Sequence, residues 1–135
     1  MRKPITPFAH GIVDYATVAT VACAPKLMRL SLRAQATCYA LAGGYAMLYM
    51  LTDYPLSVKK AIPFKAHGVA EGAVGALLPA IPFLLDFADE SPARNLCFGL
   101  AAFTGVVAAL TDWNKQSERI ARRRHRRKPR LVRAA

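Results

Sequence analysis

Charged side chains are missing from two long stretches of this chain. Residues 34–52 hold 19 consecutive uncharged positions, and residues 95–111 hold 17. A membrane-crossing helix needs about 20 mainly apolar residues, so both stretches predict transmembrane helices. Two further apolar runs, residues 8–25 and 66–85, are each interrupted by a single acid, Asp14 and Glu71. Both runs are long enough to cross a membrane if that acid is tolerated.

Cysteine is also scarce, and its placement gives little support to an enzyme. Cys23, Cys38 and Cys97 form no C-x-x-C pair and no interleaved finger spacing, which excludes the common zinc-finger and dithiol motifs. In an apolar segment an isolated cysteine behaves as a small hydrophobic residue. Quinone or thiol chemistry at Cys38 and Cys97 would need a partner thiol or base that the sequence does not supply. A non-enzymatic role is therefore favoured.

What the chain does contain is a duplication. Residues 9–14 (AHGIVD) return as residues 66–71 (AHGVAE), and residues 52–54 (TDY) return as residues 111–113 (TDW). Self-similarity of this kind indicates repeated supersecondary units. We predict an all-α fold, an integral membrane four-helix bundle built from two tandem helical hairpins. The expected units are residues 1–58, residues 59–114 and a basic tail at residues 115–135.

The basic residues predict the orientation in the membrane. Lys and Arg gather at the N-terminus, between the two repeats and in the tail, whereas acids dilute them in the other connections. Cytoplasmic loops carry an excess of Lys and Arg, so we expect a multi-pass inner-membrane protein with both termini in the cytoplasm. Both repeats then begin at the same face, which places His10 and His67 at the same depth. A body this small has little room for a substrate cavity unless it forms a homo-oligomer.

The motifs follow one order in both repeats. A His-Gly pair precedes an acid, a proline follows the histidine by fifteen positions, and a second helix ends in Thr-Asp-aromatic, over residues 3–113 in all. This order resembles the SPW-repeat family of small bacterial membrane proteins. The Ser-Pro-Trp signature itself is altered to APK at residues 24–26 and to IPF at residues 81–83. The resemblance implies a four-helix integral membrane protein and no particular activity.

The strongest functional lead is a repeated pair of ionisable residues. Each repeat carries a histidine and an acid four positions apart, which places them on one face of a helix. Ionisable groups are costly inside a membrane and mark functional sites there. Each returning helix also ends in an aspartate on the same side, so we expect all of these residues to converge. The predicted intramembrane polar cluster comprises His10, Asp14, His67, Glu71, Asp53 and Asp112.

The sequence is compatible with three functions of this cluster. In the first, the polar pairs hold helices together at about 0.6 kcal/mol each, and the protein is a structural or interaction module. In the second, the cluster carries protons or ions, because a histidine beside a carboxylate titrates near physiological pH. In the third, it binds a metal ion or haem, with His10, His67, Asp14 and Glu71 as candidate ligands.

The tail concentrates the positive charge. From Lys115 onward there are ten basic residues and one acid, Glu118, so the tail carries +9 of the formal net charge of +11. Its position after the last predicted crossing favours anionic lipid head groups as partners, at about 1 kcal/mol per basic residue. Nucleic acid is less favoured, because the tail has no folded reader domain and no interleaved aromatic residues. The residues expected at the lipid surface are Arg122, Arg123, Arg124, Arg126 and Arg127.

Overall fold

The computed structural model describes residues 3–114 of the chain. Within this range all regular secondary structure is helical, as the sequence predicts. The expected lipid contacts of Arg122, Arg123, Arg124, Arg126 and Arg127 lie outside the described residues. The helices are α1 (Pro7–Leu27), α2 (Leu32–Leu51), α3 (Phe64–Leu77), α4 (Ile81–Leu84) and α5 (Ser91–Leu110).

Local sequence signals fix where the first two helices begin. Thr6 caps α1 by accepting a 3.2 Å hydrogen bond from the Ala9 N–H, and Pro7 takes the first helical position, where its missing N–H costs nothing. Ser31 caps α2 by accepting a 3.4 Å bond from the Ala34 N–H. Both caps satisfy N–H groups that have no partner within the helix.

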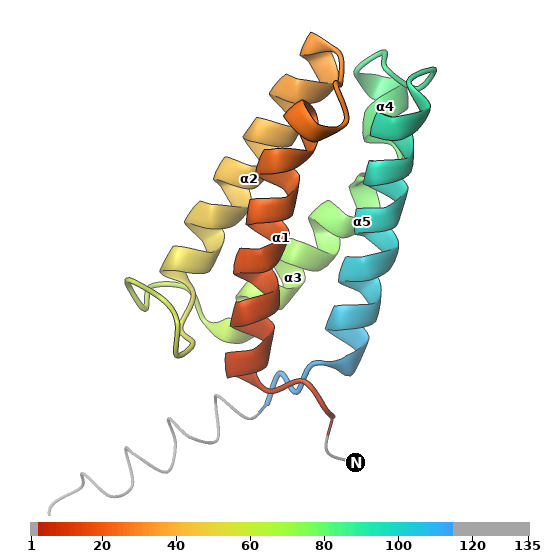
Figure 1. Cartoon of the computed structure of the whole chain (residues 1–135). Coiled ribbons are helices and arrows are strands. Elements are labelled where there is room, and N and C mark those ends of the chain that lie inside the picture. The colour runs from red at the N-terminus through yellow and green to blue at the C-terminus, as the bar shows by residue number, and fades with distance from the viewer. Residues whose placement is uncertain (1–2, 115–135) are drawn as a thin grey trace, which may run out of the picture.

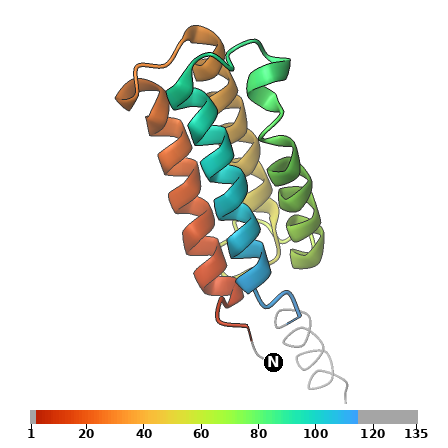
Figure 2. The ribbon, with the colours of Figure 1, turned by 90° about the vertical axis from the view of Figure 1, so that its right-hand side faces the viewer.

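The helices form two antiparallel hairpins that lie side by side. Helix α1 packs along α2, and α3 and α4 pack along α5. The α1–α2 turn and α4 lie at one end of the molecule, while the N-terminal segment and residues 52–63 lie at the other (Figure 1). The view turned by 90° shows the same arrangement, with the axes of the long helices roughly aligned (Figure 2). The two histidine-bearing helices, α1 and α3, therefore begin at the same end.

The second repeat differs from the first at one proline. The apolar run at residues 66–85, which we predicted to be a single crossing, is divided into α3 and α4. Pro79 stands where the first repeat has Ala22. Proline removes a helical N–H, clashes with the preceding turn and disfavours helix at the residue before it. Helix α3 accordingly ends at Leu77, and α3 with α4 together correspond to α1.

The two repeats close on each other through their termini. Ile5 donates a 3.1 Å backbone hydrogen bond to Leu110 and accepts one of 2.9 Å from Asp112. Ile62, its counterpart in the second repeat, makes the same two bonds with the end of α2, at 2.8 and 2.7 Å. The start of each repeat is thus tied to the end of the other. This closure brings the first turns of α1 and α3 together.

Helix α5 has the composition of a membrane span. Among the helices within residues 3–114, α5 alone is long and apolar enough to cross a bilayer by those two criteria. Helix α2 contains the longest uncharged run of the chain, yet it does not meet both criteria for a membrane-crossing helix. Its run contains three tyrosines and Gln35, which are less apolar than the phenylalanines and valines of α5.

Candidate functional site

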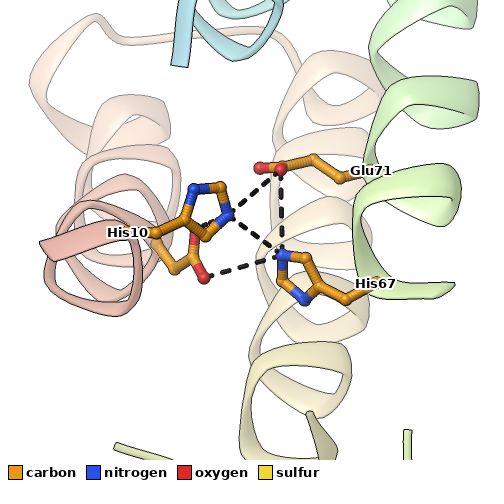
Figure 3. A group of neighbouring side chains, drawn as sticks. His10, His67 and Glu71 are labelled. Carbon is orange, nitrogen blue, oxygen red and sulfur yellow. Dashed lines mark hydrogen bonds and ion pairs between the residues drawn. The ribbon is translucent and has the colours of Figure 1, made fainter. Parts of the chain in front are cut away.

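Four ionisable side chains meet in the interior of the bundle, between α1 and α3. They are His10 and Asp14 of α1 and His67 and Glu71 of α3, which we call the His/acid tetrad. The Nε2 atoms of the two histidines are 3.2 Å apart, and Figure 3 shows both rings and Glu71 pointing at one another. Both histidines are fully buried, and the acids are 1% and 3% exposed. The structure thus brings these two histidines of the predicted cluster together.

Each acid of the tetrad contacts both histidines. Asp14 lies 3.3 Å from Nε2 of His10 and 3.7 Å from Nε2 of His67. Glu71 lies 3.4 Å from Nε2 of His10 and 3.7 Å from Nε2 of His67. Two of these four contacts join residues of the same helix, and the other two cross between the repeats. Separating the hairpins would therefore break contacts of every tetrad member.

Two threonines fix the orientation of the histidine rings. Nδ1 of His10 lies 2.9 Å from Oγ1 of Thr111, and Nδ1 of His67 lies 2.9 Å from Oγ1 of Thr52. Each threonine hydroxyl donates its single proton to the carbonyl four positions earlier, at 2.7 Å. Its oxygen can then only accept from the ring, so Nδ1 carries the proton. The Nε2 atom of each ring therefore points into the centre of the tetrad.

Two carboxylate oxygens of the tetrad are buried without a hydrogen-bond donor. Among the described residues, neither Oδ2 of Asp14 nor Oε2 of Glu71 has a hydrogen-bond partner. The second oxygen of Glu71, Oε1, accepts a 3.4 Å bond from the hydroxyl of Tyr49. Buried polar atoms are almost always paired in native proteins. Two such oxygens beside two imidazole nitrogens that face each other are the most unusual feature of this site.

Aromatic rings enclose the tetrad. Trp113 and Phe64 stand edge-on to His10, with ring centroids 5.0 and 5.4 Å away, and Tyr49 lies 5.3 Å from His67. Tyr54, in the connection after α2, is fully buried. Burial, together with the nearby Asp14, raises the pKa of Tyr54 above its ordinary value, so its phenol stays protonated. The ring wall lowers the local dielectric, which strengthens every charge interaction inside it.

The two aspartates that we expected in the cluster lie elsewhere. The carboxylate of Asp53 is 3.5 Å from Nζ of Lys60, and Oδ1 of Asp112 accepts a 3.3 Å bond from the Asn114 N–H. The metal-ligand geometry of the tetrad includes neither of them. Thr52 and Thr111, one position earlier in each repeat, supply the contacts instead. The repeated Thr-Asp-aromatic motif contains both threonines, but the charge of the neighbouring aspartate makes it the more obvious candidate.

No protein-family model, curated protein or solved structure matches this chain. The resemblance to the SPW-repeat family therefore stays a prediction. What the tetrad does has to be inferred from its geometry and surroundings.

Proposed function

We propose that this chain is a small integral membrane protein that crosses the bilayer four times, and that the His/acid tetrad joins its two hairpins. Its role is that of a structural or interaction module of the membrane, with no reaction of its own. The observation that carries this proposal is an inverted distribution of polarity. The histidines and acids of the tetrad occupy the interior, and many large apolar side chains lie exposed on the outside.

One turn of α1 illustrates the inversion. His10 is fully buried, whereas Phe8 and Ile12 on either side of it are 51% and 52% exposed. The same holds in α3, where Val69 is 74% exposed between the buried His67 and Glu71. In water, apolar side chains gathered on the outside are an aggregation liability. In a bilayer the same side chains face lipid, and the polar groups have to satisfy one another internally.

The outer surface also carries an apolar groove. It has a volume of about 560 Å³ and runs between α2, Val74 of α3 and the α4 region, where Ile81 and Leu85 line it. Its lining is almost free of polar atoms. An open groove of this kind is unfavourable in water, and lipid acyl chains would fill it in a membrane. It therefore supports residence in the bilayer.

Close contact between helices also supports a bundle in lipid, where burial of apolar surface does not drive helices to associate. A Cβ atom added at Gly75 of α3 would lie 2.8 Å from Oγ1 of Thr104 in α5, so the two backbones approach closely at this glycine. Small residues allow such approach between helices in lipid. Dispersion alone would give only weak association between the two hairpins. The tetrad adds polar contacts that strengthen this association. We further propose that both termini are cytoplasmic and that the arginine-rich tail binds anionic lipid head groups.

Membrane residence and topology are tested together. We expect the full chain to remain in the membrane after an alkaline carbonate wash and to be released by detergent. Reporters inserted after Arg29 in the α1–α2 turn should read as periplasmic. Reporters inserted after Val58 or fused after Ala135 should read as cytoplasmic. Release by carbonate, or the same side for Arg29 and Val58, would contradict the proposal.

A further inference from the structure

We infer that the His/acid tetrad is a binding site for one Zn²⁺ ion. Its ligands would be Nε2 of His10, Nε2 of His67 and one carboxylate oxygen from each of Asp14 and Glu71. The inference rests on the proposed function, because it assigns a ligand to the same four side chains that join the hairpins. It goes further by naming what holds them together.

The spacing of the four groups fits a tetrahedral ion. Zinc binds imidazole nitrogen and carboxylate oxygen at about 2.0–2.2 Å, so the ligand atoms of a regular tetrahedron are about 3.3–3.6 Å apart. The two Nε2 atoms are 3.2 Å apart. Oε2 of Glu71 lies 3.4 and 3.7 Å from these two nitrogens, while Asp14 approaches His10 through Oδ1 at 3.3 Å and His67 through Oδ2 at 3.7 Å. The ligand atoms of all four residues lie within 4.8 Å of one another.

The electron pairs of the site also call for a cation. The threonine contacts occupy Nδ1 of each histidine, and the two Nε2 atoms face each other 3.2 Å apart. The two carboxylate oxygens without a hydrogen-bond donor, Asp14 Oδ2 and Glu71 Oε2, both lie 3.7 Å from Nε2 of His67, and the Glu71 oxygen lies 3.4 Å from Nε2 of His10. Two carboxylates this close together repel each other unless positive charge lies between them. A divalent ion between them satisfies all of these atoms at once.

The surroundings resemble the support that metal ligands receive in other proteins. Metal-binding histidines donate their second ring N–H to an oxygen, and ligating carboxylates are themselves hydrogen-bonded. Here Thr111 and Thr52 accept from Nδ1 of the two histidines, and Tyr49 donates to the second oxygen of Glu71. Each threonine comes from the repeat opposite to its histidine. The closure of the two repeats is therefore what orients the ligands.

Charge and geometry select zinc over the other candidates. Two carboxylates neutralise Zn²⁺, which leaves a neutral centre suited to an apolar interior. Two nitrogens on opposite sides of a haem iron would be about 4 Å apart, with a porphyrin between them, whereas here they are 3.2 Å apart. Four protein ligands leave no open coordination position, which is typical of structural zinc and not of catalytic zinc. The ion would thus lock the hairpins together.

Metal analysis of the full chain tests this inference. The protein is purified in detergent with a tag that contains no histidine, stripped with a chelator and titrated with Zn²⁺ or Co²⁺. We expect one Zn²⁺ per chain and, with Co²⁺, the strong visible absorption of a tetrahedral complex. The variants His10→Ala and His67→Ala should lose binding by more than about 100-fold, in line with the loss of a ligand. The controls Asp53→Asn and His125→Ala should bind as the unaltered chain does.

The threonines give a second readout that does not remove a ligand. Thr52→Val and Thr111→Val keep the shape of the side chain and remove the oxygen that accepts from Nδ1. Loss of such a partner costs about 10–100-fold in metal affinity, so each variant should bind Zn²⁺ that much more weakly while remaining folded. These two variants decide the matter if the histidine variants fail to accumulate. Equal affinity in Thr52→Val, Thr111→Val and the unaltered chain would overturn the assignment.

The result also separates this inference from the proposed function. A chain that remains in carbonate-washed membranes with the expected topology but binds no Zn²⁺ refutes the zinc site and leaves the module intact. A chain that is released by carbonate refutes the membrane module, whatever its metal content. Binding of Zn²⁺ that survives in the His10→Ala/His67→Ala double variant would place the ion elsewhere and overturn the inference.

Discussion

Replacing Glu71 with alanine should destabilise the protein by about 3–5 kcal/mol, the loss expected when one member of a buried charged group is removed. Glu71 contacts both histidines and accepts from Tyr49, so its loss removes one partner from each of three buried polar groups. A single polar contact within a membrane contributes only about 0.6 kcal/mol. The tetrad exceeds that value because its members share contacts and cannot reach water.

The measurement is reversible unfolding of the detergent-solubilised chain, followed by the loss of helical circular dichroism. The matched control is Arg33→Ala. Arg33 is 63% exposed and pairs with Asp86, and it belongs to the first turn of α2, at the opposite end of the molecule from the first turns of α1 and α3. An exposed ion pair contributes about 0–1 kcal/mol, so this variant should unfold almost as the unaltered chain does. Equal losses in the two variants would show that the tetrad does not join the hairpins.

Alanine at either repeated glycine should cost about 1–3 kcal/mol through overpacking. A Cβ atom at Gly11 would lie 2.1 Å from Cε2 of Tyr54, and one at Gly68 would lie 2.7 Å from Cζ3 of Trp113. Tyr54 is fully buried, so its ring has no free space into which it can move. Both rings belong to the wall around the tetrad, and displacing them would also open the site.

The control for this prediction lies in the same helix as Gly68. Gly72 has no neighbour within 4 Å of an added Cβ. Gly72→Ala should therefore be neutral or stabilise α3 by about 0.5–1 kcal/mol, the usual gain over glycine in a helix. Thermal unfolding in detergent measures both changes. If Gly68→Ala and Gly72→Ala behave alike, the close packing of Trp113 on α3 is wrong.

The repeat made the pairing of the two histidines predictable. An equal distance of each histidine from the start of its repeat implied equal depth, and a four-residue spacing put each acid on the face of its histidine. The helical class and the position of α5 as an apolar span followed from uncharged runs of sufficient length. These features depend on local periodicity, which a sequence displays directly.

Other parts of the site depend on tertiary contacts, which periodicity does not display. Thr111 lies 101 positions from His10 in the sequence, and its role arises because the end of each repeat pairs with the start of the other. The division of residues 66–85 had a visible cause in Pro79, but the apolar pattern continues across it. The repeated aspartates drew attention by their charge, although Asp53 and Asp112 lie outside the tetrad.

A double-mutant cycle between His10 and Glu71 tests the central claim most directly. These residues belong to different repeats, and their side chains are 3.4 Å apart. The cycle compares the unfolding free energies of His10→Ala, Glu71→Ala and the double variant with that of the unaltered chain. Residues in direct contact couple by about 0.5–3 kcal/mol, and we expect a coupling in that range. Strict additivity, with a coupling below about 0.3 kcal/mol, would show that the two repeats do not meet at the tetrad.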